Sequence, residues 1–235
     1  YEMSASLVGS EMCIRDRVYL AHDLKTPLTS VIGYLTLLED EPDIPQKTRE
    51  KYTSIALNKA ERLEDLINEF FDITRFNLTN IELDIEKVNL SRMLEQICSE
   101  FLPILSEHKL SWNLDIAPDI NLMCDPDKLS RVFDNLIRNA VNYSYPDTEI
   151  TCVLTKQDKD IHILFKNHGK TISPEKLSRV FEQFFRLDSS RASSTGGAGL
   201  GLAIAKEIVE LHGGQINAAS ENESISFEVV FRNDL

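Results

Sequence analysis

The sequence predicts an α+β protein in which an antiparallel helical hairpin is followed by an α/β sandwich. Through the first third of the chain, apolar residues recur every three or four positions, which is the period of an amphipathic helix. After residue 80, segments with helical spacing alternate with segments in which every second residue is apolar, the pattern of a half-buried strand. Interleaved helices and strands of this kind predict one mixed sheet with helices on one face.

The hairpin is predicted over residues 18–78. Its first helix spans Val18–Asp40 and its second about Thr48–Asn77, and the prolines within Glu41–Gln46 break the pattern between them. The apolar seam of the second helix repeats near every 3.5 residues, as in helices that pack lengthwise. Because a two-helix hairpin cannot cover its own apolar stripe, we expect two copies to pair as a four-helix bundle, which makes the protein a homodimer.

The second domain is predicted over residues 81–235, after a polar joint at Asn77–Asn80 that we expect to act as a hinge. Helical spacing indicates helices at Ser91–Glu107, Pro126–Ser144, Pro174–Gln183 and Leu200–His212. Alternation indicates mainly antiparallel strands at Ile81–Glu86, Ser111–Ile116, Glu149–Thr155, Ile161–Phe165, Gln215–Ala219 and Ile225–Phe231.

Composition excludes several classes of protein. The chain has 235 residues, a formal net charge of −13, 42% hydrophobic and 27% charged residues, which is typical of a soluble globular protein with a real core. No run approaches the roughly 18 uninterrupted apolar residues of a membrane span. The acidity argues against a duplex nucleic-acid binder, which needs clustered Lys and Arg. The cysteine spacing predicts reduced thiols rather than disulfides or a zinc site, at Cys13, Cys98, Cys124 and Cys152.

Residues 1–17 are set aside from the fold prediction. Residues 7–17 read LVGSEMCIRDR, which resembles the conceptual translation of a transposase adapter used in DNA library preparation. We therefore expect an artefactual segment at residues 1–17 and a native chain that begins near Val18. On that interpretation the lack of an apolar span describes only this part of the protein.

A histidine on the first helix is a candidate nucleophile. His22 is followed directly by Asp23, and Thr26 comes one helical turn later. Leu20, Leu24 and Leu28 mark the apolar seam, so we expect His22 to lie off the seam, facing solvent. A neutral imidazole is a competent nucleophile, and an adjacent carboxylate can orient it or accept its proton.

Two asparagines on a predicted helix of the second domain are candidate ligands. Asn135 and Asn139 are four residues apart, which places them on the same helix face. Asparagine is a mediocre helix former, so the pair suggests a function. A side-chain carbonyl is a hard oxygen ligand that suits Mg²⁺, which binds few protein groups together with phosphates and water.

Two later segments favour a nucleotide ligand. Asn167 ends an apolar strand and is followed by Gly169, which permits a tight turn and lets the Asn167 carbonyl accept from an adenine amino group. A polar loop then leads through Gly197, Gly199 and Gly201 into a helix that opens near Leu200. Glycines before a helix N-terminus let backbone N–H groups approach phosphates, although the pattern is neither a Rossmann nor a P-loop fingerprint.

Taken in order, these blocks resemble the sensor histidine kinases with a GHKL-type ATP-binding domain. HDLKTP resembles the phospho-acceptor box, DNLIRNAVNYS the N box, NHGKTI the G1 box, FEQFFRLD the F box and GGAGLGL the G2 box. The resemblance covers about Val18 to Phe231, and the five motifs in the same order are specific together. Within the family the chain is most similar to VanS-type vancomycin-resistance sensors, through AHDLKTPLTSVIGYLTLLEDEPD and GGAGLGLAIAKEI.

The resemblance implies roles for individual residues. His22 would be autophosphorylated from ATP, with Asp23 as its acid/base partner, and Thr26 would position the water that dephosphorylates a response regulator. Arg186 of the F box would contact the transferring phosphoryl group, and Asn139 would hold Mg²⁺. The nucleotide-binding residues would be Asn135, Asn139, Tyr143, Asn167, Gly169, Gly197, Gly199, Leu200 and Gly201.

Two positions depart from the family pattern. The G1 box usually begins with an Asp that accepts from the adenine amine, whereas Asn167 stands here, so that the bond loses its charge assistance. The N box often carries Lys or Arg where Asn142 stands, which leaves Arg138 as a substitute for a phosphate contact.

The leading hypothesis from the sequence is a two-component signal-transduction kinase: ATP-dependent autophosphorylation of His22, then transfer to an aspartate of a response-regulator receiver domain, with phosphatase activity as well. The alternatives are a regulatory phosphatase or pseudokinase that acts through Thr26, and a non-enzymatic dimerisation module. The resemblance implies the cytoplasmic part of a cell-membrane sensor, with any membrane segment preceding Val18.

Overall fold

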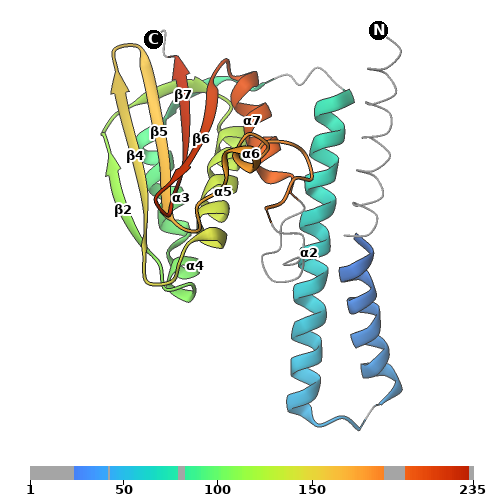
Figure 1. Ribbon diagram of the computed structural model, residues 1–235. Coiled ribbons are helices and arrows are strands. Elements are labelled where there is room, and N and C mark those ends of the chain that lie inside the picture. Colours follow the sequence, from blue (N-terminus) through green and yellow to red (C-terminus); the bar gives the residue numbers. More distant parts are fainter. Residues whose placement is uncertain (1–23, 42, 79–82, 188–198, 233–235) are drawn as a thin grey trace. The chain divides into compact units, whose positions relative to one another are not determined.

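The structure is a computed structural model that describes residues 24–41, 43–78, 83–187 and 199–232 (Figure 1). The described residues form two compact units, the first ending at Asn77 and the second beginning at Leu78. Residues 1–17, His22, Asp23, Gly197 and positions 79 and 80 of the predicted hinge lie outside the described residues. Each unit is described by itself.

The first unit is a pair of antiparallel helices, as the sequence predicts (Figure 1). A helix over residues 24–40 is followed by a short turn and by α2 at Gln46–Leu78. The carbonyl of Pro45 accepts from the Thr48 and Arg49 amides at the start of α2, at 2.8 and 3.0 Å. The rings of Tyr34 and Tyr52 make a tilted contact across the pair, with their centroids 5.4 Å apart.

The second unit is built on a five-stranded mixed sheet of order β2-β4-β5-β7-β6 (Figure 1). β2 pairs parallel to β4, and the other neighbours pair antiparallel. A separate two-stranded sheet joins β1 to β3. The strands are β1 Glu86–Asn89, β2 Ser111–Ile116, β3 Asn121–Cys124, β4 Glu149–Gln157, β5 Asp160–His168, β6 Gln215–Glu221 and β7 Ser224–Arg232.

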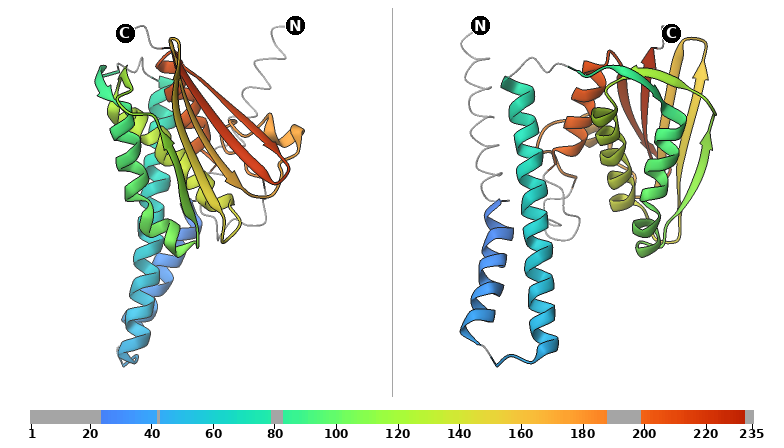
Figure 2. Two further views of the ribbon diagram at one scale, coloured as in Figure 1. Left: turned by 90° about the vertical axis from the view of Figure 1, so that its left-hand side faces the viewer. Right: turned by 180° about the vertical axis from the view of Figure 1, so that it is seen from behind.

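Helices cover one face of this sheet (Figure 2). They are α3 Leu90–Glu100, α4 Leu102–Glu107, α5 Pro126–Tyr143, α6 Pro174–Leu177 and α7 Gly201–Leu211. Except for α6, which buries no side chain, their apolar faces meet the inward-facing residues of the strands. The predicted alternation of the last strand is confirmed, since Ile225, Phe227, Val229 and Phe231 are all buried. The α/β sandwich predicted from the sequence is therefore correct.

Three predicted elements differ from the structure by more than a small shift of their ends. The helix predicted at Ser91–Glu107 is broken at Phe101, because Pro103 has no amide to donate back along the helix. The strand predicted at Ile81–Glu86 is wrong over residues 83–85, since pairing begins only at Glu86 with the unpredicted strand β3. The helix predicted at Pro174–Gln183 ends at Leu177, and the chain continues in turns in which the Arg179 amide donates to the Lys176 carbonyl at 3.1 Å and the Val180 amide to the Leu177 carbonyl at 3.4 Å.

A polar junction ties the ends of α5 and α7 together. Asp125 is buried and caps α5 by accepting from the Lys128 amide at 3.0 Å, and its other oxygen accepts from the Asp84 amide at 3.2 Å. The Asp125 amide donates to Nε2 of His212 at 3.0 Å, while His212 Nδ1 lies 2.7 Å from the Ile208 carbonyl. These contacts require the neutral tautomer with its proton on Nδ1.

Three cysteines are buried free thiols in the second unit: Cys98, Cys124 and Cys152. Burial, then the neighbouring Asp125 and Glu86 carboxylates, raise the pKa of Cys124 to about 12, so this thiol stays protonated at neutral pH. The pKa of Cys152 is raised as well, first by the hydrogen bond between Cys152 and Cys98 and then by burial. Among the described residues, no helix is long and apolar enough to cross a bilayer.

The packing of Gly214 against the core yields a stability prediction. A Cβ at Gly214 would lie 2.6 Å from Cδ1 of Phe231 and 2.9 Å from the Val230 carbonyl oxygen. We expect Gly214→Ala to lower the free energy of unfolding of the second unit by about 1–3 kcal/mol, because Phe231 must shift within a packed core. Urea unfolding followed by the fluorescence of Trp112, the single tryptophan, measures this.

Gly33→Ala is the matched control. No atom lies within 4 Å of a Cβ at Gly33, which is in the helix of the first unit. The Trp112 transition should stay in place, while removing a helical glycine stabilises the first unit by about 1 kcal/mol. A wild-type unfolding midpoint in Gly214→Ala would contradict the prediction.

Candidate functional site

The candidate nucleotide site is organised around one face of α5. Seven residues of this helix are buried in the core. Asn135 and Asn139, one turn apart on another face, are half-buried, as is Tyr143 at the last turn. Asn142 is exposed. The helix is therefore amphipathic with an amide-bearing face, as its sequence predicts.

The N-terminus of α7 meets this amide-bearing face at Asn135. A Cβ at Gly201, the first residue of α7, would lie only 2.8 Å from Oδ1 of Asn135. Leu200 precedes it as a fully buried N-cap residue that makes no side-chain capping hydrogen bond. The first-turn N–H groups of α7 therefore lack a side-chain cap, and they are the kind of donors that bind phosphate oxygens.

The C-terminus of α5 meets the end of β5. A Cβ at Gly169 would collide with the carbonyl oxygen of Tyr143 and would lie 3.3 Å from Nδ2 of Asn167. Asn167 itself is 1% exposed. Only a glycine allows the backbone after β5 to approach α5 this closely, and the approach brings Asn167, Gly169 and Tyr143 together.

The segment before Arg186 is joined to the glycine loop. The Phe184 amide donates to the Gly199 carbonyl at 2.9 Å, and both residues have positive φ, 62° and 76°. A Cβ at Gly199 would lie 2.7 Å from the Phe185 carbonyl oxygen, so this position also requires glycine. Arg186 follows directly and is half-buried.

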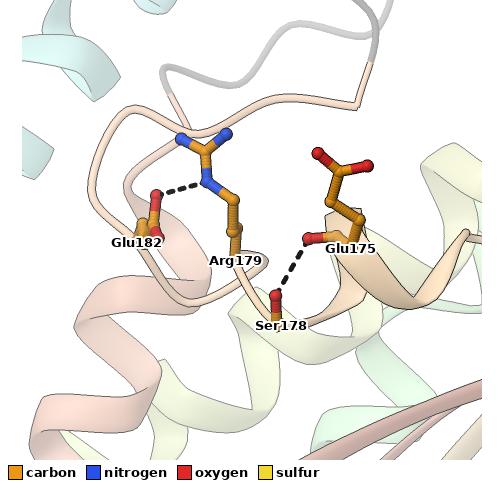
Figure 3. Close-up of polar contacts among 4 residues, drawn as sticks. All are labelled: Glu175, Ser178, Arg179 and Glu182. Carbon is orange, nitrogen blue, oxygen red and sulfur yellow. Dashed lines mark hydrogen bonds and ion pairs between the residues drawn. The ribbon is translucent and has the colours of Figure 1, made fainter.

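Polar contacts after α6 hold the same segment in shape (Figure 3). The Arg179 guanidinium pairs with Glu182 at 2.9 Å, and the Ser178 hydroxyl donates to the Glu175 carbonyl at 2.9 Å. Arg179 also lies over the Phe185 ring, 4.6 Å from its centroid. The Lys176 ammonium donates to the Leu187 carbonyl at 3.0 Å, which anchors the far side of Arg186.

Two buried donors of this site have no partner. Among the side-chain nitrogen and oxygen atoms buried in the described residues, only Nδ2 of Asn135 and Nδ2 of Asn167 make no hydrogen bond. Each orphaned donor costs about 1–3 kcal/mol in a folded protein. Both residues are predicted from the sequence to bind a nucleotide. A ligand rich in acceptor atoms would give each of these two donors a hydrogen-bond partner.

The β6–β7 turn is a part of the site that the sequence analysis missed. The Gly169 amide donates to the Glu223 carbonyl at 2.9 Å, and the Glu223 amide donates to the Thr171 hydroxyl at 2.9 Å. The Tyr145 hydroxyl donates to the Glu223 carboxylate at 3.3 Å, and loss of solvent together with this carboxylate raises the pKa of Tyr145. The sequence does carry a signal for this turn in Asn222, because asparagine tolerates the left-handed conformation that it adopts here, at φ 49°.

The remaining candidates lie apart from this cluster or are not described. Thr26 is exposed in the first unit, where its carbonyl accepts from the Ser30 hydroxyl at 3.2 Å. His22, Asp23 and Gly197 lie outside the described residues. The other candidates lie in the second unit, where contacts join Gly201 to Asn135, Gly169 to Tyr143 and Asn167, and Gly199 to the segment before Arg186. Asn139 is one turn from Asn135 on α5, and Leu200 directly precedes Gly201.

Two families match the two parts of the chain. Residues 124–234 match the family described as histidine kinase-, DNA gyrase B-, and HSP90-like ATPase. Residues 19–78 match the His Kinase A (phospho-acceptor) domain. The first match contains the nucleotide-site residues of α5, β5 and α7, and the second contains His22 and Thr26.

Curated relatives match across both parts. The chain is 58% identical over 212 residues to the sensor protein VanSC of Enterococcus gallinarum and 50% identical over 212 residues to the sensor protein VanS of Enterococcus faecium. These alignments cover 90% of this chain but 58% and 55% of the relatives, so the chain spans little more than half their length. It is 30% identical to the sensor histidine kinase YcbM of Bacillus subtilis (strain 168), covering 94% of this chain and 71% of YcbM.

Solved structures show the same fold. The histidine kinase AdeS of Acinetobacter baumannii superposes with a TM-score of 0.75 at 22% identity, over 91% of this chain and 98% of AdeS. The histidine kinase ThkA in complex with the response regulator protein TrrA superposes with a TM-score of 0.73 at 21% identity, over 99% of this chain and 64% of that one. With both domain families in order and a relative matched over most of its length, the chain belongs to the sensor histidine kinases, and its relatives include the VanS-type sensor proteins.

Proposed function

We propose that this chain is the catalytic core of a two-component sensor kinase, which phosphorylates its own His22 from Mg²⁺–ATP and passes the phosphoryl group to an aspartate of a response regulator. The observation that carries the proposal is the pair of orphaned amide nitrogens on Asn135 and Asn167. They lie at the two places where glycines let backbone segments approach α5. A nucleotide has acceptors at both ends, in its base and in its phosphates.

The donor set fits such a nucleotide. Asn167 would contact the base beside Gly169 and Tyr143. Asn135 would donate to a phosphate oxygen together with the first-turn amides that follow Leu200. Gly197, Gly199 and Gly201 would let the loop backbone cradle the phosphates. Arg186 would meet the transferring phosphoryl group, where a cation neutralises developing charge.

Asn139 is the residue that would hold Mg²⁺. Its half-buried amide offers one hard oxygen ligand, one helical turn along α5 from Asn135 toward Tyr143. Within the described residues, no group of three or more His, Cys, Asp or Glu side chains gathers to form a protein cage. One amide ligand completed by phosphates and water suits this ion. When bound, Mg²⁺ would neutralise phosphate charge and fix the orientation of the chain of phosphates.

His22 supplies the nucleophile of the proposed reaction. Its imidazole nitrogen would attack the γ-phosphorus, forming a P–N bond as the bond between the γ-phosphorus and the ADP oxygen breaks. Asp23 would orient the ring and accept the proton from the ring nitrogen that does not attack. Transfer to a receiver aspartate then breaks the P–N bond and forms a P–O bond. Thr26, one turn along, would position the water that hydrolyses the phosphorylated regulator, and the complex of the similar kinase ThkA with TrrA supports a regulator as partner.

The hairpin supports a dimer. Leu28, Ile32 and Leu35 fall on one stripe of the helix over residues 24–40 and are 45%, 56% and 52% exposed in the single chain. Leu24, Val31 and Leu38 beside them are half-buried. An uncovered apolar stripe next to a packed one is the arrangement expected where a second hairpin completes a four-helix bundle.

Autophosphorylation is tested with labelled ATP. We expect the wild-type chain to acquire an acid-labile, base-stable label and His22→Gln to acquire none, because glutamine offers no nucleophilic ring nitrogen. Thr26→Ala is the matched control on the same helical turn: it should keep the label and dephosphorylate the regulator more slowly. A wild-type chain that binds ATP but never becomes labelled would support the phosphatase or pseudokinase alternative instead.

Gly201→Ala tests the phosphate side of the site. The added Cβ would lie 2.8 Å from Oδ1 of Asn135, so the amide must move. We expect binding of Mg²⁺–ATP, measured by calorimetry, to weaken at least tenfold, which is about 1.4 kcal/mol. Gly33→Ala is the control, since it adds the same methyl group to a helical glycine of the first unit where no contacting atom lies within 4 Å of the Cβ. Equal losses in both variants would contradict a specific role for Gly201.

Ile32→Glu tests the dimer. We expect light scattering to give a dimeric mass for the wild-type chain and a large shift towards monomer for this variant, because a charge on the stripe must be buried on pairing. Gly33→Glu adds the same charge a third of a turn away, where no atom lies within 4 Å of a Cβ, and should leave the mass dimeric. A monomeric wild-type chain at micromolar concentration would refute the proposal.

A further inference from the structure

We infer that the base subsite of this chain accepts 6-oxopurine nucleotides as well as ATP, and that Asn167 sets this relaxed selectivity. The inference deepens the proposed function and rests on it, because it takes the buried amide of Asn167 to be the group that contacts the nucleotide base. The chemical class at issue is the purine nucleoside triphosphates, and inosine triphosphate is the probe that differs from ATP only at the purine 6-position and the adjoining ring nitrogen.

Asn167 offers both kinds of hydrogen-bonding atom in a buried position. The side chain is 1% exposed, and its Nδ2 donor has no partner. Nδ2 faces the tight contact between Gly169 and Tyr143, 3.3 Å from the place that a Cβ of Gly169 would occupy. A buried donor without an acceptor favours a ligand that brings one.

An amide can pair with either purine edge. Adenine presents an amino donor beside a ring-nitrogen acceptor, so Oδ1 would accept from the amine while Nδ2 donates to the ring nitrogen. A 6-oxopurine presents a carbonyl acceptor beside a ring N–H donor, so Nδ2 would donate to the carbonyl while Oδ1 accepts from the ring N–H. A half-turn about the terminal torsion of Asn167 exchanges the two arrangements.

The surroundings do not impose one of these orientations. Nδ2 of Asn167 makes no hydrogen bond within the described residues, and the terminal torsion of asparagine is broad and roughly two-fold. The flanking Lys166 and His168 are exposed, and strand alternation turns them to the opposite face of β5. Neither neighbour on the strand therefore brings a charge that would favour one edge of the base.

A carboxylate at the same position would behave differently. Aspartate is acceptor-only when ionised, so at the purine 6-position it would accept from the adenine amine with charge assistance but would meet the 6-oxo oxygen with nothing to donate. Of the two atoms on the 6-oxopurine edge, only the ring N–H could pair with the carboxylate, and that pairing would hold the carboxylate beside the unpaired 6-oxo oxygen. Sites that pair with a donor on the substrate reject analogues that lack it strongly, because a polar group is then left unpaired. Selectivity for adenine therefore depends on the single atom that distinguishes asparagine from aspartate.

Calorimetric titration of the full chain with Mg²⁺–ATP and Mg²⁺–ITP tests the inference. We expect the wild-type dissociation constants for the two nucleotides to differ by no more than about fivefold, since both arrangements make neutral hydrogen bonds. In Asn167→Asp, ATP should bind more tightly and ITP at least about 20-fold more weakly than ATP. Asn113→Asp, the same change at an exposed position of β2, should keep the wild-type ratio.

The outcomes separate the two proposals. A wild-type chain that binds ATP but discriminates against ITP by more than about 20-fold overturns the inference and leaves the proposed function standing. A chain that binds neither nucleotide overturns the proposed function. An unchanged ATP-to-ITP ratio in a folded Asn167→Asp overturns the role of Asn167. If Asn167→Asp shows no Trp112 unfolding transition, the variant does not fold. The ratio of the wild-type dissociation constants for ATP and ITP then decides the inference by itself.

Discussion

The close approach of two backbone segments to α5 is the constraint on which the nucleotide domain depends. At one end of the amide-bearing face, Gly201 brings the start of α7 against Asn135, and at the other, Gly169 brings the end of β5 against the Tyr143 carbonyl. The opposite face of α5 is buried in the core, so the helix cannot retreat from either contact. The distance between the two ends of the site is therefore set by the packed core and by two glycines, Gly169 and Gly201.

This close packing leaves polar atoms buried before any ligand arrives. Nδ2 of Asn135 and Nδ2 of Asn167 lose contact with water and gain no protein partner. The fold carries that cost, and a ligand that supplies acceptors at both places recovers it, so ligand binding also stabilises the folded domain. The two amides therefore couple the stability of the domain to occupation of the site.

Much of this arrangement could be predicted from the sequence, for reasons that are local. The alternation of Ile225 through Phe231 and the helical spacing around Asn135 are properties of single segments, and both elements form as expected. The strand β3 was missed because its four residues carry no pattern, and only pairing with β1 makes them a strand. The contribution of Glu223 was missed because the hydrogen bond to Gly169 spans 54 positions of the chain. Contacts of that kind depend on tertiary structure, which no short motif encodes.

The acidity of the chain and its anionic ligand can be reconciled at this site. A net charge of −13 repels a nucleotide at long range, but charges beyond about 8 Å are largely screened at physiological ionic strength. What matters is the immediate shell, and the groups that the proposed site would offer there are the Asn135 and Asn167 amides, the Arg186 cation and the first-turn amides of α7. None of these is a carboxylate, and no acidic residue stands in the first turn of α7. In the proposed site, binding would therefore depend on a few oriented dipoles and one cation, so that a change in a single glycine or a single amide would be enough to weaken it.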